Sequence, residues 1–133
     1  MNVSLNDRDV RGILRCEAAA GLLASLLLYA GMDGNWPLFA ALILVPDLSM
    51  LGYLAGPRIG ALSYNVAHST MLPWLIFAAG ILLTLPVMAA VALIWIAHVF
   101  FDRAFGFGLK YKTGFANTHL GSAALPIRPR STG

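Results

Sequence analysis

The chain contains few charged residues and a single cysteine. Charged residues make up 11% of its 133 residues, whereas hydrophobic residues make up 59%. A soluble domain needs a larger polar surface than this composition supplies, so the composition indicates an integral membrane protein. One cysteine cannot form an internal disulfide, and we interpret Cys16, at the start of an apolar segment, as a buried packing residue.

Charge is missing altogether from the long segment 59–101. A membrane-crossing helix needs ~20 apolar residues to cover a hydrocarbon layer of ~30 Å, so this segment is too long for one crossing and long enough for two. With the apolar segments before it, the pattern predicts an all-α integral membrane fold, an antiparallel four-helix transmembrane bundle with a cytoplasmic C-terminal tail. The expected spans are residues 12–32, 36–55, 59–82 and 86–105.

The basic residues predict how this bundle lies in the membrane. All nine lysines and arginines fall around the start of the first span, in the turn between the second and third spans, or at and after the end of the fourth. Short basic segments stay on the cytoplasmic side, so we expect a multi-pass protein of the bacterial inner (cell) membrane with cytoplasmic N- and C-termini. Glu17, inside the first segment, and Leu28, near the best cleavage point, disfavour a cleaved signal peptide.

We divide the chain into two parts. Residues 1–121 form the four-span membrane domain, whose glycine-rich segment 106–121 is expected to fold back onto the cytoplasmic mouth of the bundle. Residues 122–133, which end in "PIRPRSTG", are expected to be a loose C-terminal tail.

Ionisable side chains inside the spans are the candidates for a functional site. Such a side chain costs ~2.5–3.5 kcal/mol on insertion scales and usually faces the interior of a bundle. With the predicted orientation, each of the four helices brings at least one acidic or imidazole group to the cytoplasmic half, and we expect these groups to share one site. They are Glu17, Asp47, His68, His98 and Asp102, with Asn65 beside them.

The types and spacing of these residues indicate a metal site. His98 and Asp102 are separated by four positions and share one helix face. Pro46 cannot donate a backbone hydrogen bond and should kink the second helix beside Asp47. Imidazole and carboxylate groups from facing helices suit divalent Zn, Fe or Mn. We therefore predict that the metal ligands are Asp47, His68, His98 and Asp102.

Three polar residues are expected to surround these ligands. Tyr64 and Asn65 precede His68 by four and three positions and share its face, while Glu17 lies at a similar depth on the first helix. A plainer interpretation of each stays open. Tyr64 and Asn65 would then be polar contacts between helices, and Glu17 would pair with an interfacial arginine.

Acid/base catalysis is assigned to one of these ligands and one further residue, and contact with the substrate to two lysines. Asp102 and His119 are candidate catalytic acid/base groups, with His119 supplied by the folded-back segment, and a metal ion would polarise a substrate oxygen or generate hydroxide. Lys110 and Lys112 would contact anionic head groups or an anionic substrate. Alternatively, His98 and Asp102 form only a structural pair, and the lysines are ordinary cytoplasmic anchors.

Two segments carry a family resemblance. "PDLSMLGYLAGPRIGALSYNVAHSTMLP" and "IWIAHVFFDRAFGFGLKYKTGFANTHLG" resemble the signature segments of the domain of unknown function 4260 family, small bacterial membrane proteins with four spans. The similarity covers nearly the whole chain and implies the four-span architecture without a particular activity. It also implies that the family's motif positions are occupied by Glu17, Asp47, Tyr53, Asn65, His68, His98, Asp102, Arg103, Gly108, Lys110, Gly114, Phe115, Thr118 and His119.

Two functions fit these observations. The first is a metal-dependent membrane enzyme that acts on a lipid or other membrane-associated substrate from the cytoplasmic leaflet. The alternative is a noncatalytic accessory subunit of a larger membrane complex, with a polar cluster that specifies helix packing. An ion or proton conductor is a third interpretation, weakened because the opposite half of the bundle has almost no polar residues. The expected partners are membrane lipid and either a larger complex or a second copy of the chain, and we expect no nucleic-acid partner.

Overall fold

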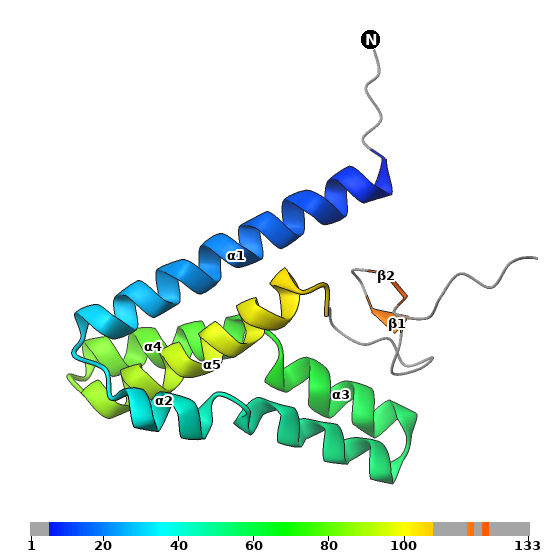
Figure 1. The fold of residues 1–133 in the computed structure, drawn as a ribbon. Helices are drawn as coiled ribbons and strands as arrows, with labels where there is room; N and C mark the ends of the chain where they lie inside the picture. Colours follow the sequence, from blue (N-terminus) through cyan, green and yellow to red (C-terminus); the bar gives the residue numbers. More distant parts are fainter. Residues whose placement is uncertain (1–5, 108–116, 119–120, 123–133) are drawn as a thin grey trace, which may run out of the picture.

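The computed structural model describes residues 6–107, 117–118 and 121–122 of the chain (Figure 1). Within these residues the fold is helical, except for two short strands that pair antiparallel. The elements are α1 (Asp7–Gly31), α2 (Trp36–Leu42), the 3₁₀ helix η1 (Val45–Ala55), α3 (Pro57–Ala67), α4 (Met71–Leu82), α5 (Pro86–Ala104), β1 (Asn117–Thr118) and β2 (Gly121–Ser122).

Four helical segments are long and apolar enough to cross a membrane, as the sequence predicts. They are Asp7–Gly31, Trp36–Ala55, Pro57–Leu82 and Pro86–Ala104. The first begins earlier than the predicted residue 12 because Asn6 caps it. The Asn6 side chain accepts a hydrogen bond from the Arg8 N–H at 2.6 Å, and Asp9 accepts one from the Asn6 N–H at 3.3 Å.

The second segment is broken between α2 and η1, next to Asp47. Pro46 has no N–H to donate to the Leu42 carbonyl, where α2 ends. The chain continues as the tighter 3₁₀ helix η1, with Asp47 in its first turn. The predicted kink beside Asp47 is therefore confirmed.

The third segment is also broken, at residues 68–70 between α3 and α4. Pro73 lies in the first turn of α4, where it cannot donate to the Ser69 carbonyl. The pattern of apolar residues did not predict this break. It places His68 at the end of α3 instead of inside a continuous helix.

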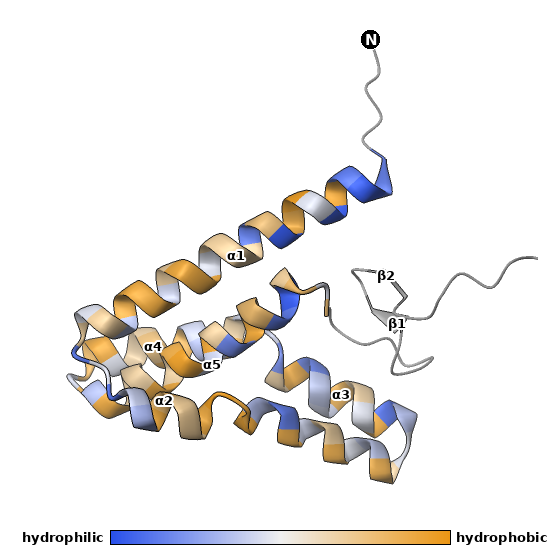
Figure 2. Ribbon diagram, viewed as in Figure 1, coloured by the Kyte–Doolittle hydropathy of each residue, from blue (hydrophilic) through white to orange (hydrophobic). Residues whose placement is uncertain are grey.

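α5 lies at the centre of the helical bundle and packs against both α1 and α4. Figure 2 shows that apolar residues dominate these helices and that hydrophilic residues gather at the N-terminal end of α1. A helix that is apolar on all sides is typical of a core position. The buried residues of α5 are Ala89, Ala92, Leu93, Ile94, Ile96, Ala97, His98 and Val99.

α1 approaches α5 through small residues. Ala18 and Ser25 are buried, and a Cβ atom added at Gly21 would lie 2.7 Å from the ring of Phe100. Small residues at such a contact let two helix backbones come close. Cys16 lies two positions before Ala18, about 200° around the helix from it, and it is exposed. Our interpretation of Cys16 as a buried residue is therefore wrong.

η1 and α3 pack against each other as a hairpin that extends away from α5 (Figure 1). The hairpin turns at Gly56, whose φ of 116° favours glycine. Gly60 lies against the ring and the Cα atom of Tyr53, so a side chain at position 60 would not fit between the two helices. The base of this hairpin carries Asp47 and His68.

Gly80 provides a test of the α4–α5 packing. A Cβ atom added there would lie 2.7 Å from the backbone nitrogen of Ala89, which cannot move without shifting α5. We expect Gly80→Ala to lower the free energy of unfolding by about 1–3 kcal/mol, measured by thermal unfolding in detergent micelles. Gly12→Ala is the control because nothing lies within 4 Å of its added Cβ, and it should be neutral or slightly stabilising. Equal stabilities for the two variants would contradict this packing.

Candidate metal centre

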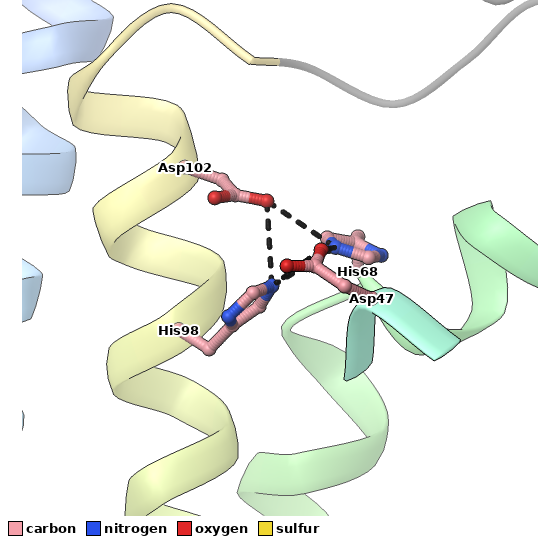
Figure 3. Close-up of side chains that lie close together, drawn as sticks. All are labelled: Asp47, His68, His98 and Asp102. Atoms are coloured by element: carbon pink, nitrogen blue, oxygen red, sulfur yellow. Dashed lines mark hydrogen bonds and ion pairs between the residues drawn. The ribbon is translucent and has the colours of Figure 1, made fainter. Parts of the chain in front are cut away.

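Four side chains from three of the apolar segments converge on one point (Figure 3). Asp47 comes from the first turn of η1, His68 from the end of α3, and His98 and Asp102 from α5. One nitrogen or oxygen atom from each residue lies within 4.8 Å of the others. The structure thus brings together the four residues that the sequence predicts as ligands, while their binding of a metal stays a prediction.

Five of the six separations between these atoms are close to those of a tetrahedral ligand shell, and the sixth, between the two carboxylate oxygens, is within 4.8 Å. His68 Nε2 lies 3.1 Å from His98 Nε2, 3.3 Å from Asp47 Oδ1 and 3.2 Å from Asp102 Oδ2. His98 Nε2 lies 3.3 Å and 3.4 Å from the same two carboxylate oxygens. Ligand atoms at ~2.0–2.1 Å from a shared ion in tetrahedral geometry lie about 3.3–3.4 Å from one another. One cation at the centre would therefore reach all four atoms.

The hydrogen bond on the outer nitrogen of His68 directs a lone pair at this centre. His68 Nδ1 lies 3.0 Å from the Tyr64 carbonyl oxygen. A carbonyl can only accept, so Nδ1 carries the proton of the neutral ring. In a neutral ring, His68 Nε2 then presents a lone pair to another imidazole nitrogen and two carboxylate oxygens, and either a proton on an imidazole or a bound cation would stabilise this arrangement. Metal-ligating histidines typically donate the opposite N–H to a backbone carbonyl in this way, and the Ile43 backbone is a hydrogen-bond partner of His98.

Burial separates Asp47 from the other three residues. The side chains of His68 and His98 are each 3% exposed and that of Asp102 is 16% exposed, whereas that of Asp47 is 40% exposed. The Tyr64 ring stacks on the His68 ring with their centroids 3.7 Å apart. Three of the four residues are thus enclosed by packing, and Asp47 forms the accessible side of the cluster.

Two further α5 residues hold the broken third segment in place. The Trp95 indole N–H donates to the Ala67 carbonyl, and Arg103 Nη2 donates to the His68 carbonyl at 3.3 Å. A helix break frees carbonyls that need such partners in an apolar environment. Neither role was predicted from the sequence. The spacing of Trp95, His98 and Asp102 at i, i+3 and i+7 was the available signal, since it places all three on one face.

The remaining predicted site residues differ in where they lie. Tyr64 is buried against His68, and Asn65 is half-buried on the same helix. Glu17 is exposed on α1, one position from the buried face that contains Ala18, so α1 contributes none of the four clustered residues. The expectation that every span supplies a group is therefore not met within the described residues. His119, Lys110 and Lys112 lie outside the described residues.

A cavity of about 510 Å³ reaches the cluster from the side of α1 and α2. Asp47, His98 and Asp102 line its polar end. We call this cavity the α1–α2 groove, and its other lining residues are Leu22, Leu26, Phe39, Ile43, Leu44, Ala97 and Phe101. The groove gives a molecule outside the bundle a route to three of the four clustered residues.

Comparison with known protein families identifies the family of this chain. The chain matches the model of the family described as Domain of unknown function (DUF4260) over residues 11–123, which include the four apolar helical segments apart from residues 7–10 and all four clustered residues. The chain belongs to the DUF4260 family. This membership confirms the resemblance seen in the two signature segments. No curated protein and no solved structure matches the chain.

Trp95→Phe tests whether the hydrogen bond from Trp95 at the break in the third segment positions His68 in this DUF4260 protein. The substitution keeps an aromatic ring but removes the N–H that binds the Ala67 carbonyl. We expect the affinity for Zn²⁺ to fall by about tenfold, the lower end of the range for partners that orient ligands. Affinity would be measured in detergent by competition with a chromogenic chelator.

Trp74→Phe is the matched control, because Trp74 lies on α4 in edge contact with Phe77 and takes no part in the break. It should bind Zn²⁺ like the unsubstituted protein. Similar affinities for both variants would mean that Trp95 does not position His68.

Proposed function

We propose that this DUF4260 protein is a metal-dependent membrane enzyme that acts on a lipid or other membrane-associated substrate. The observation that carries the proposal is the set of two imidazole nitrogens and two carboxylate oxygens at tetrahedral separations, drawn from three separate apolar segments. Such groups are costly in an apolar layer and are retained there when they bind something. This donor set suits Zn²⁺, Fe²⁺ or Mn²⁺.

The proposed setting is an antiparallel bundle that crosses the membrane with both termini on the cytoplasmic side. Arg15, near the start of the first segment, donates to the carbonyl of Ala104, the last residue of the fourth, at 2.8 Å. These two ends therefore lie at one level, and the basic residues cluster there and at the Arg58 turn. The cluster then lies in the half of the membrane that faces the cytoplasm, because His98 and Asp102 belong to the last turns of α5.

The exposure of the four residues indicates two different roles in the proposed site. His68, His98 and Asp102 are the enclosed ligands that would hold the ion. Asp47 is accessible from the α1–α2 groove, so its carboxylate is the ligand that would shift when a substrate oxygen approaches. The bound ion would polarise that oxygen or lower the pKa of a bound water, the two usual roles of a metal Lewis acid.

A noncatalytic accessory subunit is the second candidate, and one observation favours it. Four protein ligands fill a tetrahedral shell, as they do in structural zinc sites, and catalytic sites usually keep one position open. The cluster would then only tie the η1–α3 hairpin to α5. The two candidates differ in whether an external ligand can reach the ion.

Metal content is the first measurement. Protein extracted in mild detergent without chelator should contain one divalent ion per chain by elemental analysis, and His98→Ala should lose it. Asp33→Asn is the control, since Asp33 lies in the turn at the opposite end of α1, in a backbone conformation that asparagine tolerates. Absence of stoichiometric metal in the unsubstituted protein, both as purified and after addition of Zn²⁺, would refute the proposal.

Cobalt substitution separates the enzyme from the accessory subunit. Co²⁺ in the site should show the intense visible absorption of a tetrahedral ion. Added azide should change that spectrum if the accessible side admits an external ligand, as an enzyme requires. An unchanged spectrum, together with a partner protein that co-migrates in native extraction, would favour the accessory subunit.

A further inference from the structure

The α1–α2 groove has one polar end and one apolar end. Asp47, His98 and Asp102 form the polar end. Leu26 and Phe39 lie toward the turn at residues 32–35, which joins α1 to α2. Along α1 and along the second segment, the groove therefore runs from an apolar residue near that turn to a basic or polar region at the opposite end.

This gradient matches the orientation of a lipid in the cytoplasmic leaflet. In the proposed topology the turn at residues 32–35 faces away from the cytoplasm, so the apolar end of the groove points toward the middle of the membrane. The polar end points toward the cytoplasmic head groups. A lipid of that leaflet carries its head group and its chain in the same order, so it can enter the groove sideways without inverting.

Basic residues continue the groove beyond the cluster. Arg11, Arg15, Leu22 and Leu26 follow one another at helical spacing along one stripe of α1. Arg15 reaches the Ala104 carbonyl, so it lies about two residues, or ~3 Å along the axis, beyond the level of Asp102. A second cavity of about 250 Å³ opens there, lined by Arg8, Arg11, Gly12, Arg15 and Gly106.

The charge of the second cavity is complementary to a phosphate group. Arg15 uses Nε for the Ala104 carbonyl and keeps its terminal N–H groups available, and Arg8 and Arg11 are exposed. Guanidinium groups bind phosphate oxygens through paired hydrogen bonds. The groove itself, at about 510 Å³, falls within the size range of ordinary small-molecule sites.

We propose that the α1–α2 groove binds a phosphate-bearing amphiphile of the cytoplasmic leaflet. One apolar chain lies along Leu22, Leu26 and Phe39, and the phosphate lies between Asp47 and the arginines of α1. An oxygen of the head group then meets the cation held by the four-residue cluster. This inference rests on the proposed function and adds to it the class of substrate and its route of entry.

Photolabelling tests the proposal in detergent-solubilised, metal-loaded protein. The probe is an alkyl phosphate with a diazirine near the end of its chain, and the comparison probe is the matching uncharged alkyl alcohol. Labelling by the phosphate probe should saturate, should be competed by unlabelled alkyl phosphate, and should map to peptides that contain residues 22–26 or 39–44. Label confined to other segments, or equal competable labelling by the alcohol, would overturn the proposal.

Leu26→Trp should fill the apolar end of the groove, whereas Leu27→Trp places the same ring on the neighbouring exposed position. We expect competable labelling to fall by about tenfold in Leu26→Trp and to stay unchanged in Leu27→Trp, because excluding about two methylene groups already costs a factor of this size. Arg11→Gln should likewise weaken the phosphate probe, while Arg58→Gln, in the other basic turn, should not. Equal effects within either pair of variants would argue against the proposed pose.

Metal content, measured in every sample, separates this inference from the proposed function. A bound ion without competable labelling of the groove would refute the lipid site and leave the metal site standing. Loss of the ion from the unsubstituted protein would refute the proposed function itself. If a tryptophan variant fails to fold, the position of the label in the unsubstituted protein still tests whether the groove binds a lipid.

Discussion

A polar atom inside an apolar layer must find a polar partner within the protein, and this requirement governs the arrangement of the proposed spans. Pro46 and Pro73 interrupt two of them and free backbone groups that a continuous helix would use. α5 supplies the partners at the second break, through Trp95 and Arg103. The same helix supplies His98 and Asp102, so the cluster and the support of the broken backbone are parts of one interface.

Much of this arrangement could be read from the sequence, because membrane spans are specified by length and apolar content. The same low polarity made the four clustered residues visible, since a carboxylate or an imidazole in a span is costly. Side-chain rotation about the helix axis was harder to predict. Glu17 lies on the exposed side of α1, and the exposure of Cys16 follows from a packing face set by Ala18 and Ser25. The roles of Trp95 and Arg103 could not be predicted, because the break that they support depends on contacts between distant segments.

Asp47 connects the two parts of the proposed site. The break that follows α2 places it in the first turn of η1, where it faces the cluster and also lines the groove. A continuous second helix would have kept the backbone hydrogen bonds at this depth and removed the local freedom that directs Asp47 inward. The backbone irregularity thus lies where a polar group and an apolar cavity meet, as is usual for interrupted helices in membrane proteins.

The location of His98 and Asp102 on the last helix has a consequence for biogenesis. Synthesis delivers the chain from its N-terminus, so the segments with Asp47 and His68 emerge from the ribosome before the helix that supplies their partners. During that interval Asp47 and His68 lack their contacts with His98 and Asp102, and the carbonyls at the break after α3 lack Trp95 and Arg103. In the proposed membrane setting, these groups would stay without those partners in an apolar layer until α5 is in place, so the order of synthesis makes the last helix the one that completes the site.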